Sequence, residues 1–112
     1  MEAQEKGEWS RLIKDFLDPI TVTKAEILEV HSGAPSSRIT GLEYDSRKAG
    51  EGCLFFALPG LHADGHDFIS EAIRCGARAI VHEKELGEYR EDVMYIRARD
   101  SRFAMSPISD SF

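Results

Sequence analysis

The chain has 112 residues, of which 42% are apolar and 30% charged, as is usual for a soluble globular domain. Its 20 acidic and 14 basic residues give a net charge of −6, which argues against a general nucleic-acid binder, because such domains carry a basic stripe. The longest apolar run, residues 53–58, is far shorter than the roughly 20 residues of a bilayer span. We therefore expect one domain that binds neither nucleic acid nor membrane. Its two cysteines fit no metal or disulfide pattern, which favours the cytoplasm.

The first part of the chain predicts one helix and two strands. Apolar residues recur at helical spacing over residues 9–17, and Asp18-Pro19 is expected to end this helix, because proline disfavours helical geometry in the residue before it. Residues 27–30 predict a short strand, and the stretch 32–37 is rich in loop formers. A second strand is predicted from residue 39 to residue 45.

The middle of the chain predicts a strand-helix-strand unit. Residues 53–58 are apolar on both faces, which is typical of a strand that is covered on both sides. Residues 68–73 have helical spacing, with Gly76 as a left-handed cap. Residues 79–81 are again apolar on both faces, so the whole segment reads as a βαβ unit with parallel strands.

The last part predicts a fifth strand and a final helix. The strand covers residues 93–96, and Asp100 is placed to cap the helix, which Pro107 should kink or split. We expect an α/β fold: a small single domain with a four- to five-stranded mixed sheet flanked by two or three helices. The chain ends at Phe112 without a capping glycine, and we expect it to be truncated at this end.

Two polar clusters follow predicted strands, and the sequence leaves their relative position open. Residues 45–48 follow the strand 39–45, and residues 62–67 follow the strand 53–58. Ligands gather beyond the carboxyl ends of strands in α/β sheets. A parallel pair usually needs a crossover of a dozen or more residues, whereas only residues 46–52 connect these strands. A hairpin would place the clusters at opposite edges, so either the strands are not neighbours or a ligand spans the sheet edge.

Caps and turns are the simplest explanation of the two clusters. Asp64 with Asp67 three residues later resembles a helix N-cap followed by an acid in the first turn. Asp45-Ser46 is a common turn dipeptide.

Two kinds of chemical site are alternatives to the caps. A zinc site could use four neighbouring side chains, although their spacing fits no established pattern, and a Ser46–His–Asp triad lacks the glycines of a nucleophile elbow. Anion binding could use hydroxyl and cationic groups, with glycines that permit close backbone approach. The zinc candidates are His62, Asp64, His66 and Asp67, and the anion candidates are Ser46, Arg47, Lys48, Gly60 and Gly65.

Three segments together resemble the amino-terminal domain of the Mur ligases, most closely the MurE type, which adds the third amino acid to UDP-N-acetylmuramoyl-L-alanyl-D-glutamate. The segments are residues 39–47, residues 52–60 and residues 64–69, and the resemblance continues through residues 76–81. The domain of the D-alanyl-D-alanine-adding ligase is similar in its Asp-Gly-His-Asp-Phe-Ile segment. A non-enzymatic interaction module is the alternative from another class.

The resemblance implies a set of substrate-binding residues. Ser46 would donate its hydroxyl to the nucleotide or diphosphate, Tyr44 and Leu61 would wall the uridine, and His62 and Ala63 would contribute backbone groups. No catalytic residue and no metal ligand is implied. The partners are UDP-N-acetylmuramoyl-dipeptide and the rest of the ligase chain, with its central ATP-binding domain.

The resemblance also places the chemistry outside this segment. In the parent enzyme, ATP and magnesium phosphorylate the D-glutamate carboxylate, and the amine of the added amino acid displaces the phosphate. A phosphate-binding loop needs a Gly-Lys pair, and these 112 residues contain none. We therefore expect no cofactor in this segment and no activity from it alone. The identity of the third amino acid, diaminopimelate or lysine, depends on another domain.

Overall fold

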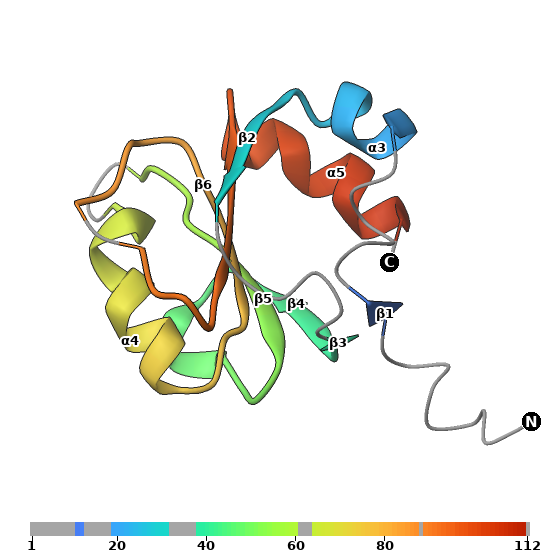
Figure 1. Cartoon of the computed structure of the whole chain (residues 1–112). Helices are drawn as coiled ribbons and strands as arrows, with labels where there is room; N and C mark the ends of the chain where they lie inside the picture. Colours follow the sequence, from blue (N-terminus) through green and yellow to red (C-terminus); the bar gives the residue numbers. More distant parts are fainter. Residues whose placement is uncertain (1–10, 13–18, 32–37, 61–63, 88, 112) are drawn as a thin grey trace, which may run out of the picture.

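A five-stranded mixed sheet runs through the middle of the protein, in the order β2-β7-β6-β5-β4 (Figure 1). The computed structural model describes residues 11–12, 19–31, 38–60, 64–87 and 89–111. Strands β4 to β7 are parallel to one another, and β2 pairs antiparallel with β7. The strands are β2 (Ile27–His31), β4 (Gly41–Glu43), β5 (Cys53–Phe56), β6 (Ala79–His82) and β7 (Met94–Ala98).

Helices cover both faces of this sheet. Helix α4 (Ile69–Arg74) lies on one face, and α3 (Pro19–Lys24) and α5 (Ser101–Ser111) lie on the other (Figure 1). Alternate residues of the strands enter two separate cores, as the period-two geometry of a strand requires. On the α5 side the core contains Leu54, Phe56, Val81, Ile96 and Ile108, and on the α4 side it contains Phe55, Ile69, Ala72, Ile80 and Tyr95. The predicted α/β class and mixed sheet are thus confirmed.

The predicted βαβ unit is present. Every residue of β5 and β6 is buried, which explains why both segments are apolar on both faces. The two strands pair in parallel, and the 3-10 turn η2 (Gly65–Phe68) leads into α4 between them. Gly76 follows α4 with φ +118, and a Cβ there would lie 2.6 Å from Glu51 Cα, so the predicted glycine cap is confirmed.

Strands β4 and β5 are parallel neighbours, which neither sequence-based alternative anticipated. The chain returns to the start of the sheet through residues 44–52, in which the 3-10 turn η1 (Ser46–Lys48) replaces a crossover helix. Gly52 N–H donates to Gly76 O at 2.8 Å and anchors the end of this connection below α4. The chain therefore leaves β4 and β5 at the same, carboxyl edge of the sheet.

Three sequence predictions are corrected. Arg11–Leu12 forms strand β1, which pairs with β3 (Arg38–Ile39), so the helix predicted over residues 9–17 is wrong there; its other residues lie outside the described ranges. Pro19 begins α3 instead of ending a helix, because the first helical position needs no N–H donor. The strand predicted over residues 39–45 is divided between β3 and β4.

The final helix is confirmed, but Pro107 does not split it. Asp100 Oδ1 accepts a hydrogen bond from Phe103 N at 2.9 Å, as expected of a cap, and α5 continues through Pro107. Ala104 and Ile108, both buried, fix the helix against the sheet on either side of the proline. No helix in the described ranges is long and apolar enough to cross a bilayer.

Candidate functional site

A cavity of about 570 Å³ opens at the carboxyl edge of the sheet, and we call it the edge cavity. The turn after β4 forms one wall, the start of η2 and α4 forms another, and β5 contributes the floor. Such edges are the usual ligand sites of α/β sheets. The edge cavity is lined by Tyr44, Asp45, Ser46, Arg47, Phe55, Leu58, Gly65, Phe68 and Glu71.

Two of the five predicted binding residues line the edge cavity. Tyr44 is 62% exposed, so its ring is free to contact a ligand, whereas Ser46 is only 7% exposed. The other three, Leu61, His62 and Ala63, lie outside the described residues. The residues that flank them are described, and both Leu58 and Gly65 line the cavity. The structure therefore brings Tyr44 and Ser46 together with Leu58, three residues before the segment 61–63, and with Gly65, two residues after it.

The hydroxyl of Ser46 has a partner that no sequence motif indicates. Ser46 Oγ donates to Glu71 Oε1 at 2.8 Å, which links η1 to α4. Phe68, 39% exposed, lies three residues before Glu71 and lines the same cavity. The spacing of three residues places Phe68 and Glu71 on one side of the chain, next to the buried Ile69 and Ala72, but it does not reveal the contact with Ser46.

Arg47 forms an ion pair with the nearby Asp45. Asp45 caps η1 by accepting from Arg47 N at 3.0 Å, and its carboxylate also accepts from Nε and Nη2 of the same arginine. These hydrogen bonds lower the pKa of Asp45 and raise that of Arg47. The turn interpretation of Asp45-Ser46 is thus confirmed, and Arg47 enters the edge cavity with its charge already balanced.

Asp64 and His66 hold the second segment to the end of β6. Asp64 Oδ1 caps η2 through His66 N at 2.9 Å and contacts His66 Nδ1 at 2.7 Å, while Asp64 Oδ2 pairs with Lys84 Nζ. His66 Nε2 accepts from the backbone N–H groups of Glu83 at 3.0 Å and Lys84 at 3.3 Å. Hydrogen bonds to the Asp64 carboxylate keep its pKa far below the ordinary range. The hydrogen bond from the Lys84 side chain has the largest effect, and that from the His66 backbone N–H has the next largest. The predicted N-cap is confirmed.

These contacts do not support the two alternatives of a metal site and a catalytic triad. Among the described residues no group of three or more histidine, cysteine, aspartate or glutamate side chains is arranged to hold a metal ion. His62, one of the four zinc candidates, lies outside those residues. The Ser46 hydroxyl faces a carboxylate instead of the histidine that a triad requires.

Gly65 lines the edge cavity and also permits a close approach between two backbone segments. Its N–H donates to Leu58 O at 2.7 Å, and a Cβ at this position would lie 2.5 Å from Leu58 N. Only glycine permits this contact, which closes the base of the segment between β5 and η2.

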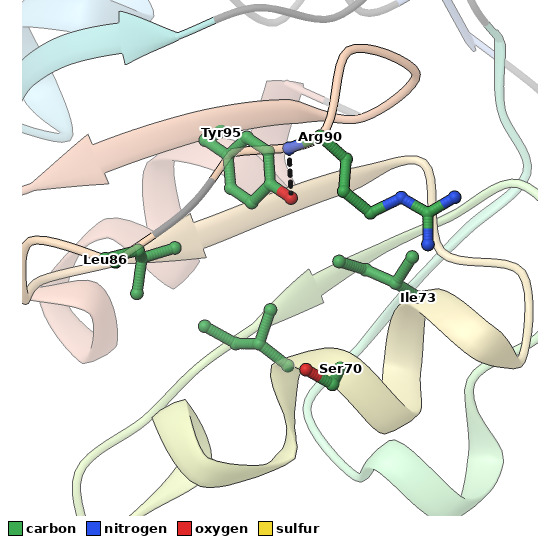
Figure 2. A pocket seen from close by; sticks show the side chains of 7 residues that line it. Ser70, Ile73, Leu86, Arg90 and Tyr95 are labelled. Carbon is green, nitrogen blue, oxygen red and sulfur yellow. Dashed lines mark hydrogen bonds between the residues drawn. The ribbon is translucent and has the colours of Figure 1, made fainter.

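A second cavity, of about 800 Å³, lies on the other flank of α4, and we call it the flank cavity. Figure 2 shows Ser70 and Ile73 from α4 opposite Leu86, Arg90 and Tyr95. Two of its polar side chains already have partners: the Tyr95 hydroxyl accepts from Arg90 N at 3.1 Å, and the Arg90 guanidinium donates to Asp92 at 3.2 Å. The flank cavity has no contribution from the turns at the carboxyl ends of β4 and β5.

Comparison with known proteins gives one consistent result. The sequence model described as "Mur ligase family, catalytic domain" matches residues 38–104. The chain is 43% identical over 99 residues to the UDP-N-acetylmuramyl-tripeptide synthetase of Treponema pallidum, covering 87% of this chain and 18% of that protein. It is 46% identical over 82 residues to the UDP-N-acetylmuramoyl-L-alanyl-D-glutamate–2,6-diaminopimelate ligase of Geobacillus kaustophilus, covering 73% and 16%.

The fold has a solved counterpart in the same group of proteins. The crystal structure of MurF from Acinetobacter baumannii matches with a TM-score of 0.71 and 20% identity, over 91% of this chain and 21% of that one. At this identity the likeness concerns the fold alone. The chain spans less than a fifth of the length of the two curated relatives named above.

Proposed function

Because this chain belongs to the Mur ligase family, we propose that it is the docking domain for UDP-N-acetylmuramoyl-L-alanyl-D-glutamate in a cytoplasmic ligase of peptidoglycan synthesis. The ligase adds the third amino acid, diaminopimelate or lysine, in a reaction driven by ATP with magnesium. The names of the two curated relatives support this assignment. Parts of the enzyme outside these 112 residues carry the chemistry, and the segment alone has no activity.

The edge cavity is the observation that carries the proposal. The parallel pairing of β4 and β5 puts Tyr44 and Ser46 in one cavity with Leu58 and Gly65, which precede and follow the segment 61–63 by three and two residues. One extended ligand can therefore touch both polar clusters. The alternative in which the clusters lie at opposite edges of the sheet no longer applies.

The ring of Tyr44 and the side chain of Leu61 wall the uridine, and His62 and Ala63 contribute backbone groups. The high exposure of Tyr44 supports the first of these roles, because a stacking platform must leave its face open to the ligand. The ties of Asp64 and His66 to the end of β6 support the second, because they fix the chain immediately after residue 63.

Calorimetric titration with UDP-N-acetylmuramoyl-L-alanyl-D-glutamate tests the docking role. Replacement of the stacking ring in Tyr44→Ala is expected to weaken binding by about tenfold, since base–aromatic stacking contributes about 1–3 kcal/mol. Phe103→Ala is the matched control, because Phe103 is a similarly exposed aromatic residue that does not line the cavity. Equal affinities for the two variants would contradict the docking role, and no saturable binding by the wild type would favour an interaction module.

The D-alanyl-D-alanine-adding ligase is the second candidate, because its amino-terminal domain is similar in the Asp-Gly-His-Asp-Phe-Ile segment, residues 64–69 here. Phosphate release from ATP by the complete ligase separates the two. The first candidate requires release with the dipeptide precursor and a diamino acid, and the second requires release with the tripeptide precursor and D-alanyl-D-alanine. Phosphate release by the 112-residue chain alone would contradict its predicted inactivity.

A further inference from the structure

Glu71 places a carboxylate in the edge cavity at a point where the resemblance implies no binding residue. It belongs to α4, is half-buried, and lines the cavity together with Tyr44 and Phe68. Ser46, on the opposite wall, holds it through the hydrogen bond of 2.8 Å between Oγ and Oε1. Both residues line the cavity, but Ser46 is only 7% exposed whereas Glu71 is half-buried, so the carboxylate is the more accessible group of the pair.

The direction of this hydrogen bond determines what the pair can offer to a ligand. A serine hydroxyl has one proton, and here that proton points to Glu71. An ionised carboxylate is an acceptor only, with lone pairs remaining after it has accepted one bond. The Ser46–Glu71 pair therefore presents acceptors and no donor. It suits N–H and O–H groups and has nothing to give to phosphate oxygens, which are acceptors themselves.

The charge of the cavity points the same way. Its lining includes the carboxylates of Asp45 and Glu71 and the guanidinium of Arg47, which Asp45 already neutralises. Glu71 thus leaves the lining with net negative charge, which repels a diphosphate. Two exposed rings, Tyr44 and Phe68, provide apolar surface instead.

We propose that Glu71 is a specificity-determining residue, which reserves the edge cavity for the nucleoside and keeps the diphosphate outside it. This inference rests on the docking function proposed above. The carboxylate accepts from the N–H of the uracil base or from ribose hydroxyls, while Tyr44 and Phe68 pack against the rings. Ser46 acts as a positioning residue that holds Glu71 in place, a different role from donating its hydroxyl to the diphosphate.

Amide chemical-shift titrations of the 112-residue chain with uridine and with UDP test the proposal. The wild type is expected to bind uridine within about threefold of UDP, because the phosphates gain nothing inside the cavity. Glu71→Gln keeps an acceptor oxygen for Ser46 and removes the charge. It should weaken uridine binding and raise the preference for UDP over uridine by about tenfold, as expected when a charge-assisted hydrogen bond is lost and a repulsion removed.

Glu91→Gln is the matched control. Glu91 is an exposed residue in the turn that precedes β7, at the opposite edge of the sheet, and its replacement changes the net charge equally. The proposal requires that this variant retain the wild-type preference. It also requires that Ser46→Ala, measured by the same titrations, raise the preference for UDP over uridine, as Glu71→Gln does.

Three outcomes would overturn the proposal. An unchanged preference in Glu71→Gln, or equal changes in Glu71→Gln and Glu91→Gln, would remove the specificity role and leave the docking function standing. No binding of either ligand by the folded wild type would overturn the docking function and the role of Glu71 together.

Discussion

The contact between Gly65 and Leu58 allows a sharp test of how the second binding segment is held. In Gly65→Ala the added Cβ would lie 2.5 Å from Leu58 N and 2.8 Å from Leu58 O, both backbone atoms that no side-chain rotation can move away. The two backbones must separate by roughly 1 Å, which breaks the hydrogen bond of 2.7 Å between them. Overpacking costs about 1–3 kcal/mol and the lost hydrogen bond about 1 kcal/mol. We expect a loss of about 2–4 kcal/mol in the free energy of unfolding.

Urea denaturation followed by circular dichroism measures this loss, with Gly50→Ala as the control. Gly50 is exposed, and a Cβ there would meet nothing within 4 Å. Its replacement should leave stability unchanged or raise it by up to about 1 kcal/mol, because alanine restricts the unfolded chain. Gly65→Ala should also weaken binding of the UDP precursor, since Gly65 lines the edge cavity. Stabilities within about 0.5 kcal/mol of each other for the two variants would refute this reasoning.

Three further predictions concern stability. Burial lowers the pKa of His82 below 6.5, so as the pH falls this histidine binds a proton in the unfolded chain before it does in the folded one. The free energy of unfolding should therefore decline from about pH 6.5 downward, by up to about 1.4 kcal/mol per pH unit. His82→Gln should flatten this slope in urea titrations between pH 5 and 7. His66→Ala leaves the N–H groups of Glu83 and Lys84 without their acceptor and should cost about 1–3 kcal/mol, with faster hydrogen exchange at both amides; unchanged exchange would contradict the assigned contacts. Pro107→Ala restores a helical N–H in α5 and should stabilise the chain by about 1–3 kcal/mol in thermal melts, whereas a loss would show that the proline is needed there.

The buried part of the fold was readable because its physical signal is local. The strands β5 and β6 are apolar on both faces, which is the composition expected of a strand that is covered on both sides. Gly76, with its positive φ, marked the end of α4 in the same direct way. The signals from Pro19 and Pro107 were ambiguous, because proline also fits the first position of a helix and is tolerated where packing holds the helix on both sides.

The sequence-based predictions that were wrong or incomplete concern features that depend on contacts between distant segments. Residues 9–17 have helical spacing, but Arg11–Leu12 forms a strand because it pairs with β3. No local pattern reveals this pairing. The parallel course of β4 and β5 depends on the turn η1, which fits beneath α4. Tyr44 and Ser46 were found from the motif, but Glu71 was not, because its relation to Ser46 exists only after α4 has packed against that turn.

The most direct test of the account maps where UDP-N-acetylmuramoyl-L-alanyl-D-glutamate binds, by following all backbone amide shifts of the chain during a titration. The edge cavity predicts saturable shifts at Tyr44, Ser46 and Phe68, with the signals of the flank-cavity residues Leu86 and Tyr95 unmoved. Saturable shifts centred on Leu86 and Tyr95, with Tyr44 and Ser46 unaffected, would contradict it.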